Sequence, residues 1–274
     1  MPAKLHRLLS VIGACLLALS ADAQADTPDP ELASVFSQAG SKGVFVLYDL
    51  QSKELHVSDP QRAKQRFTPA STFKMLNALI ALQTGVVSGP EEIFRWDGQP
   101  RFIKSWERDL SLRQAMAESA VPVYQEVARR IGQQRMQHFV TATGFGNNAI
   151  GQAIDRFWLD GPLAISAIEE ARFTARLAQG QLPFDRAVQA DVRAMLAGEK
   201  TADYQLFGKT GWATNQQPTL GWYSGWVERA DGQRFAFALN MDIASSAELG
   251  KRQALVKAAL IALQIIPAQA AGAD

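Results

Sequence analysis

The sequence predicts an α/β fold of the α+β type, in which helices flank a central antiparallel sheet and an all-helical lobe is inserted. Segments rich in β-branched and aromatic residues occur near the N-terminus and again after residue 200, with helical patterns between them. The chain has 274 residues, of which 47% are hydrophobic and 20% charged, as in an ordinary globular protein with a sizeable core. We therefore expect a single catalytic domain over residues 26–274, with its helical lobe at roughly 86–198.

The first 25 residues are expected to be a secretory signal peptide. Lys4 and Arg7 precede an apolar run at residues 8–19, and the small residues of Ala21-Asp22-Ala23 mark a cleavage region. The apolar run is shorter than the roughly 20 residues that a membrane-spanning helix needs. The prediction is an exported domain without stable membrane insertion, located in the periplasm of a Gram-negative bacterium.

The only cysteine, Cys15, lies inside this apolar run. The segment Ile12-Gly13-Ala14-Cys15 also resembles a lipoprotein-processing box, although the apolar residues 16–19 continue past it. In either case no disulfide is expected in the mature chain, so core burial must stabilise it. A net charge of +1 provides no electrostatic footprint for nucleic acid. The expected partner is a small molecule, and the expected state is a monomer or homodimer.

The N-terminal part is expected to form a helix and two strands, followed by a second helix. Polar residues 26–35 lead into the first helix, and residues 43–50 and 54–57 are strand-like, with a turn at Gln51-Ser52. The next helix begins near Ala70 and ends at Gly85. Its apolar residues recur with helical spacing: Met75, Leu76, Leu79, Ile80 and Leu82.

The middle of the chain contains signals for helix ends. Ser111 with Gln114, and Ser166 with Glu169, have the spacing of capping boxes at helix N-termini. Four glycines are expected at helix C-termini, namely Gly132, Gly144, Gly180 and Gly198.

After residue 200 the pattern indicates strands and one closing helix. Strands are expected at 205–209, 220–227 and 234–241, with Asp231-Gly232 marking a hairpin. An amphipathic helix is expected from about Glu248 to Ile265, ending at Pro267.

Ser71 and Lys74 are the candidate nucleophile and the source of its base. Residues three apart lie on one helix face, so an amine would lie beside a hydroxyl. A lone Ser-x-x-Lys is common, and it also fits an exposed helix start with a solvated lysine. Apolar Phe73 and Met75 favour a buried lysine instead. None of the three histidines lies in a nucleophile motif, so a Ser-His-Asp triad has no obvious base.

Two further motifs follow in order, Ser119-Ala120-Val121 and Lys209-Thr210-Gly211. Taken alone, the first fits a plain connection between helices and the second a strand end with a salt-bridging lysine. Together with Ser71, they predict a cleft between the sheet and the helical lobe. The chemistry indicated is acyl transfer on a β-lactam-like amide.

Six segments together resemble the motif series of class D β-lactamases, the oxacillinases. These are residues 69–74 (Pro-Ala-Ser-Thr-Phe-Lys), 119–121 (Ser-Ala-Val), 145–147 (Phe-Gly-Asn), 157–159 (Phe-Trp-Leu), 209–211 (Lys-Thr-Gly) and 225–227 (Gly-Trp-Val). The apolar Val121 favours class D, because class A enzymes and many penicillin-binding proteins have asparagine there. Phe145 departs from the tyrosine that is usual in the family, so residues 145–147 are interpreted as structural.

The resemblance implies that Lys74 is carboxylated by CO2 or bicarbonate to N6-carboxylysine and serves as the general base in acylation and deacylation. No metal or organic cofactor is implied. Trp158, Val121 and Leu159 would form an apolar cage, and the indole N–H of Trp158 would donate a hydrogen bond to the carbamate.

The resemblance also implies roles around the reacting serine. Backbone N–H groups of Ser71 and Trp212 would hold the oxyanion, and Ser119 and Lys209 would relay a proton to the departing nitrogen. The implied substrate-binding residues are Val121, Leu159, Thr210, Gly211, Trp212 and Arg252. Thr210 and Arg252 would bind the substrate carboxylate.

The function implied is hydrolysis of penicillins through a serine acyl-enzyme, and so antibiotic resistance. Two alternatives remain open. A penicillin-binding D,D-peptidase would use the same acylation but deacylate slowly on β-lactams. A β-lactam-sensing receptor domain would bind covalently and would also need membrane-spanning helices.

Overall fold

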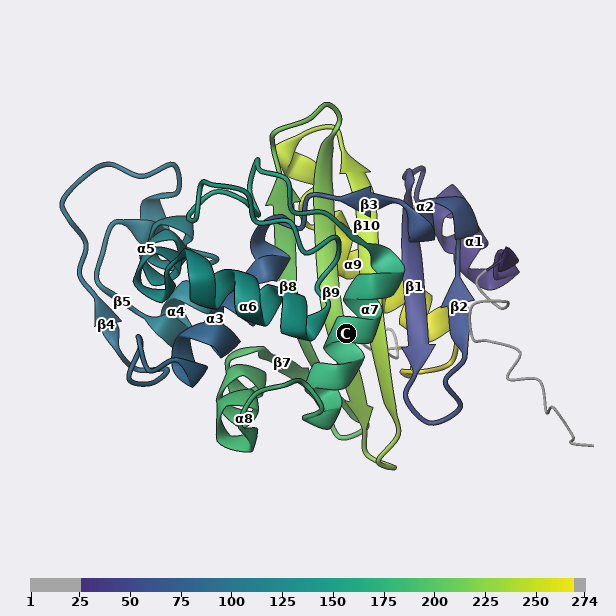
Figure 1. Ribbon diagram of the computed structural model, residues 1–274. Helices are drawn as coiled ribbons and strands as arrows, with labels where there is room; N and C mark the ends of the chain where they lie inside the picture. The colour runs from purple at the N-terminus through teal and green to yellow at the C-terminus, as the bar shows by residue number, and fades with distance from the viewer. Residues whose placement is uncertain (1–25, 269–274) are drawn as a thin grey trace, which may run out of the picture.

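The computed structural model describes residues 26–268, so the expected signal peptide and Cys15 lie outside the described residues. A six-stranded antiparallel sheet with the order β2-β1-β10-β9-β8-β7 forms the centre of the molecule (Figure 1). Its strands are β1 (Gly43–Asp49), β2 (Leu55–Val57), β7 (Ala197–Lys200), β8 (Tyr204–Ala213), β9 (Thr219–Arg229) and β10 (Arg234–Ile243). Strand β1 pairs with β10, which confirms a sheet assembled from both ends of the chain.

Helices cover both faces of the sheet and form a lobe beside the end of the sheet that carries β8 and β7 (Figure 1). The helices are α1 (Pro30–Gln38), α2 (Pro60–Lys64), α3 (Lys74–Gln83), α4 (Leu112–Ala117), α5 (Val121–Ile131), α6 (Gln133–Thr143), α7 (Ala167–Gln179), α8 (Arg186–Met195) and α9 (Lys251–Ala262). Helices α1 and α9 pack on one face, and α7 packs on the other against β1, β9 and β10. The cleft therefore lies where the lobe meets β8.

The inserted lobe is mostly helical but also contains strands. The short strands β4 (Ile93–Phe94) and β5 (Leu110–Ser111) pair within it, and β3 (Arg66–Phe67) pairs with β6 (Ile165–Ser166). Helix α7 falls within the boundaries 86–198 expected for the lobe, but it packs mainly on the sheet. These two-residue strands are too short to produce a periodic pattern in the sequence.

The predicted caps agree with the structure at most positions. Both capping boxes are present, at Ser111 and at Ser166. Gly144 and Gly180 end helices in the left-handed conformation, as predicted, and Gly132 ends α5.

The prediction for Gly198 is wrong, because this residue lies in β7. Helix α8 ends at Leu196, whose backbone is in the right-handed helical region, and the chain enters the strand directly, so no left-handed cap is needed. A Cβ at position 198 would lie 3.1 Å from the Leu206 carbonyl oxygen, so close approach to β8 favours glycine.

The closing helix is shorter than predicted at both ends. A separate 3₁₀ turn spans Ser246–Glu248, and α9 covers only Lys251–Ala262. After Ala262 the backbone N–H of Ile265 donates to the Leu260 carbonyl at 2.8 Å, which closes the helix with a turn. Ile265 is still buried, so it keeps the apolar pattern that extended the prediction.

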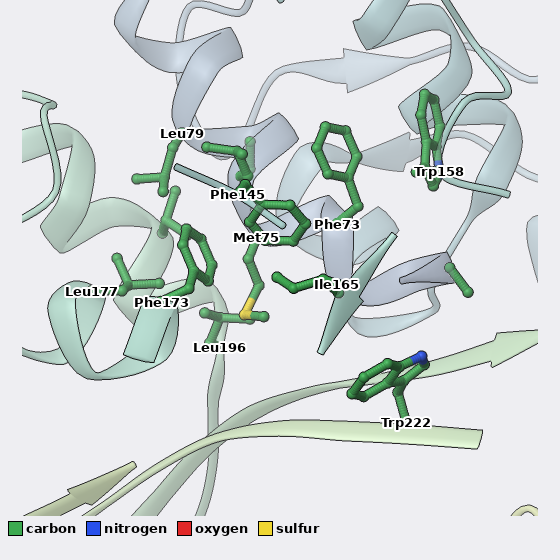
Figure 2. Close-up of a cluster of buried hydrophobic side chains, with 14 of the residues drawn as sticks. Phe73, Met75, Leu79, Phe145, Trp158, Ile165, Phe173, Leu177, Leu196 and Trp222 are labelled. Atoms are coloured by element: carbon green, nitrogen blue, oxygen red, sulfur yellow. The ribbon is translucent and has the colours of Figure 1, made fainter. Parts of the chain in front are cut away.

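The larger core joins the lobe, α7 and the sheet (Figure 2). Phe73 lies at its centre, with the Phe145 ring 5.6 Å away in an edge-on arrangement. Phe145 also meets Phe173 of α7 at 5.0 Å and is buried. Phe145 is therefore part of the aromatic packing beneath the Ser71 turn, where its lack of a hydroxyl leaves no buried polar group to satisfy.

Candidate active site

The turn carrying Ser71 is held under backbone strain. Residues 70–73 form a 3₁₀ turn that precedes α3, so the predicted helix begins with a tighter turn than expected. Ala70 has a φ of 50°, an uncommon conformation for a residue with a side chain. Its backbone N–H donates to the Trp158 carbonyl at 2.9 Å, so the loop that carries Trp158 helps to fix the turn.

Lys74 lies directly behind Ser71. Its Nζ donates to Ser71 Oγ at 2.7 Å, as the spacing of three residues predicted. The lysine side chain is completely buried (0% exposed) and lies over the Tyr124 ring, with Nζ 5.5 Å from the ring centroid. Burial lowers the pKa of Lys74 well below its usual range, and the positive charge of Lys209 lowers it further. Burial therefore favours the neutral amine over the ammonium form.

Ser119 and Lys209 approach the site from two other elements. Ser119 lies in the connection from α4 to α5, with a left-handed φ of 57°. Such strain in a non-glycine residue is typical of functional sites. Lys209 on β8 is buried and donates to the Thr210 carbonyl at 2.9 Å. Burial, together with the charge of Arg252, lowers the pKa of Lys209 to about 7, so it can both give and take a proton near neutrality.

Gly211 lets β8 approach the Ser71 turn. A Cβ there would lie 3.1 Å from the Pro69 carbonyl oxygen and 3.1 Å from Trp222 Cβ. A side chain at this position would therefore push the strand away from Ser71.

Trp158 is fully buried between aromatic rings. Its ring stacks on Phe73, the residue that precedes Lys74 in the chain, with ring centroids 5.4 Å apart and an interplanar angle of 26° (Figure 2). Its indole Nε1 is buried and has no hydrogen-bond partner among the described residues. A buried donor without an acceptor costs about 1–3 kcal/mol, so this N–H is suited to an acceptor at the site.

A cavity of about 500 Å³ opens in front of these groups, within the size range of small-molecule sites. It brings together eight of the residues singled out from the sequence: Ser71, Ser119, Val121, Leu159, Thr210, Gly211, Trp212 and Arg252. The other three, Lys74, Trp158 and Lys209, are buried and do not line this cavity, and Lys209 lines a neighbouring cavity that shares Thr210 with it.

Arg252 of α9 reaches the cavity past Gly221 of β9, where a Cβ would lie 2.9 Å from Arg252 Cδ. Its Nη1 donates to the Gly211 carbonyl and its Nε to the Leu249 carbonyl, both at 2.7 Å. Burial lowers the pKa of Arg252 to about 10, yet the guanidinium stays charged at neutral pH. The arginine is thus held in place, with a positive charge beside Thr210 at the cavity.

One apolar wall of the cavity was not predicted residue by residue. Phe102 and Ile103 line it together with Trp106, and Phe102 is 81% exposed. The Phe102 ring lies 6.5 Å from the ring of Trp212 on the opposite wall. Nothing in the local pattern distinguishes Phe102 from a surface residue, because its role depends on a loop folding back to β8.

The described residues contain no group of three or more histidines, cysteines or acidic residues arranged to hold a metal ion. Within residues 26–268 there is also no helix with the length and hydrophobicity needed to cross a membrane.

Comparisons with known proteins agree with this geometry. Residues 43–261 match the family described as the penicillin-binding protein transpeptidase domain. The chain is 44% identical to β-lactamase OXA-48 of Klebsiella pneumoniae, over 85% of this chain and 87% of the relative. It is 40% identical to β-lactamase OXA-10 of Pseudomonas aeruginosa, over 89% and 92%. The crystal structure of FUS-1 (OXA-85), a class D β-lactamase of Fusobacterium nucleatum subsp. polymorphum, superposes with a TM-score of 0.85 at 39% identity. That match covers 88% of this chain and 100% of the other.

Proposed function

This chain belongs to the class D β-lactamases, and from that membership we propose that it hydrolyses penicillins through an acyl-enzyme on Ser71, with Lys74 as the source of the base. The observation that carries the proposal is the contact of 2.7 Å between Lys74 Nζ and Ser71 Oγ, with the lysine completely buried. An exposed lysine has a pKa of about 10.4 and is protonated at neutral pH. Burial lowers the pKa of Lys74 and so favours the neutral amine, which can accept a proton or react with CO2.

The surroundings of Lys74 fit a carboxylated side chain. The neutral amine that burial favours is the form that reacts with CO2, and the unpaired Trp158 Nε1 offers a buried donor for a new oxygen acceptor. Val121 and Leu159 add apolar surface on the cavity side. When carboxylated, Lys74 supplies a general base for both halves of the reaction.

In acylation, the Ser71 hydroxyl gives its proton to the Lys74 side chain, and Ser71 Oγ bonds to the lactam carbonyl carbon. The backbone N–H groups of Ser71 and Trp212 stabilise the oxyanion, an effect worth about 3–4 kcal/mol per donor in other enzymes. The lactam C–N bond then breaks. Ser119 and Lys209 deliver a proton to the departing nitrogen, for which the pKa of about 7 suits Lys209. The proton that Lys74 took from Ser71 then replaces the one that Ser119 and Lys209 gave up, so Lys74 is again a free base before deacylation.

In deacylation, a water molecule loses a proton to the Lys74 side chain and attacks the ester carbonyl carbon. The ester C–O bond breaks, and the proton returns to Ser71 Oγ, which restores the free enzyme. Arg252 and Thr210 bind the substrate carboxylate throughout, because the guanidinium is fixed by two backbone carbonyls and stays charged. Gly211 and Trp212 place the substrate along β8.

The decisive experiment is to mix the purified mature protein with a penicillin. Repeated turnover, with mass spectrometry showing a transient adduct on Ser71, is the expected result. A stable one-to-one adduct without turnover would favour a penicillin-binding D,D-peptidase instead. Turnover by a Ser71→Ala variant, which cannot be acylated at this position, would overturn the assignment of Ser71 as the nucleophile.

Activity is expected to depend on dissolved CO2. In degassed, mildly acidic buffer the Lys74 amine is increasingly protonated and unable to react with CO2, so penicillin turnover should fall, and added bicarbonate should restore it. The measurement is initial rate against bicarbonate concentration at several pH values, with ionic strength held constant by chloride-free salt. Initial rates that do not change with bicarbonate concentration at any pH would argue against carboxylation of Lys74.

Export to the periplasm, where penicillins act, belongs to this proposal as well. Processing near residue 25 would be seen by N-terminal sequencing of the protein recovered from the periplasm.

A further inference from the structure

A buried carboxyl group on α7 has no part in the mechanism above. The side chain of Glu170 is completely buried (0% exposed), and neither of its carboxyl oxygens has a hydrogen-bond partner among the described residues. An ionised carboxylate in such surroundings is far more costly than a neutral one. Buried polar groups of this kind are rare enough to need a specific explanation.

Two buried hydroxyl side chains, those of Thr72 and Ser224, lie close enough to this carboxyl group to influence its pKa, although neither forms a hydrogen bond of regular geometry with it. Thr72 follows Ser71 in the 3₁₀ turn, and Ser224 on β9 lies directly opposite Lys209 in the β8–β9 register. Cross-strand partners point to the same face of a sheet. Glu170 therefore lies between the turn that carries Ser71 and β9, the strand that pairs with the lysine's strand.

The available protons favour the neutral acid. Thr72 Oγ1 already donates its only proton to the Pro69 carbonyl at 3.0 Å, so toward Glu170 it can only accept. A carboxylate cannot donate, whereas a protonated carboxyl group can. The hydroxyl of Ser224 is buried and unpaired, and it can donate to the second carboxyl oxygen. All three side chains are satisfied together only when Glu170 carries a proton.

We propose that Glu170 is a positioning residue that acts as a neutral acid, joining Thr72 to Ser224 and so holding Ser71 and Lys209 in position for acylation. Its ionisation removes the donor to Thr72 and leaves a negative charge between the turn and the strand, so acylation slows as pH rises. This inference rests on the proposed acyl-enzyme function.

The charges around Glu170 place its titration near neutrality. Burial raises the pKa of Glu170 to about 7, the negative charge of Glu169 adds to the shift, and the hydroxyl of Ser224 opposes it. Among the described residues, Arg176 on α7 donates to the Thr143 carbonyl and Arg234 on β10 pairs with Glu228, and five further cations of the surrounding elements also have other partners. These pairs are Arg62 with Asp242, Arg66 with Glu169 and Arg193 with Glu228, while Lys74 donates to Ser71 and Lys209 to the Thr210 carbonyl.

Glu170→Gln tests the inference, because glutamine has the same shape, stays neutral and can donate to Thr72 while accepting from Ser224. The acylation rate constant for a penicillin is measured by stopped flow in saturating bicarbonate between about pH 6 and about pH 9. The ratio of variant to wild-type rate should be near one at the acidic end and rise about tenfold or more at the alkaline end, where the wild type is ionised. Glu126→Gln, on the exposed face of α5 and paired with Arg130, is the control, and its ratio should stay flat.

A flat ratio for Glu170→Gln, or equally slow acylation at every pH, would overturn the inference. Infrared spectra of the wild type give a second readout that needs no variant. A protonated-carboxyl C=O band that shifts on ¹³C-glutamate labelling should be present near pH 6 and fade as pH rises, and its absence would also overturn the inference. Failure here leaves wild-type turnover and its response to bicarbonate intact, whereas failure of the proposed function would abolish both.

Discussion

Lys74→Ala is expected to lower kcat/KM for a penicillin by about 10²–10⁴-fold, the usual contribution of a general base. Without the amine, Ser71 Oγ loses its contact at 2.7 Å and has no group to take its proton. Both acylation and deacylation should slow, because the same side chain serves each. Rapid-quench mass spectrometry separates the two rates.

The fold should tolerate this change, since removing a buried amine also removes the cost of keeping it from water. Lys64→Ala is the matched control, because Lys64 is half-exposed on α2 and paired with Asp26. Its kcat/KM should equal that of the wild type. A Lys74→Ala enzyme that retains kcat/KM within about tenfold, with an unchanged melting temperature, would show that another group activates Ser71.

Trp158→Phe is expected to lower the carboxylated fraction of Lys74 and to slow deacylation by about 10- to 100-fold, the effect of losing about 1–3 kcal/mol from one buried hydrogen bond. Phenylalanine keeps an aromatic ring against Phe73 but has no N–H. In ¹³C-bicarbonate, the carbamate NMR signal of the variant should be weaker than that of the wild type. Mass spectrometry should show acyl-enzyme accumulating, with partial recovery of turnover at high bicarbonate.

Trp226→Phe is a close control for this change. Trp226 is also fully buried, stacks on Phe207 at 4.7 Å and donates its Nε1 to Glu228 at 3.1 Å, on a strand away from the cavity lining. It should lose some melting temperature without losing the carbamate signal. If both variants retain the signal and deacylate normally, Trp158 is a core aromatic and nothing more.

Much of the fold could be predicted because its signals are local. The capping boxes at Ser111 and Ser166 depend on residues three apart, and the long strands of the C-terminal part repeat apolar residues over many positions. The misassigned Gly198 shows the limit of such reasoning. Glycine suits both a helix cap and a close approach between strands, and only the pairing of β7 with β8 distinguishes the two.

The candidate site divides in the same way. Most site residues could be found in the sequence because they lie in short, ordered motifs that the family shares, and the cavity brings six of these motif residues together with Trp212 and Arg252. Phe102 and Glu170 could not be found, because neither lies in a motif. Phe102 becomes a cavity wall only when its loop reaches Trp212, and Glu170 becomes notable only once α7 covers β9.

The sequence by itself determined the family, the type of fold and the order of the chemical groups, because these follow from residue identity and spacing along the chain. The tertiary structure decided the protonation of those groups. The pKa values of Lys74, Lys209 and Glu170 are shifted mainly by burial, and the elements that bury them come from distant parts of the chain. Desolvation depends on everything that surrounds a charge in space, so no local pattern can specify it.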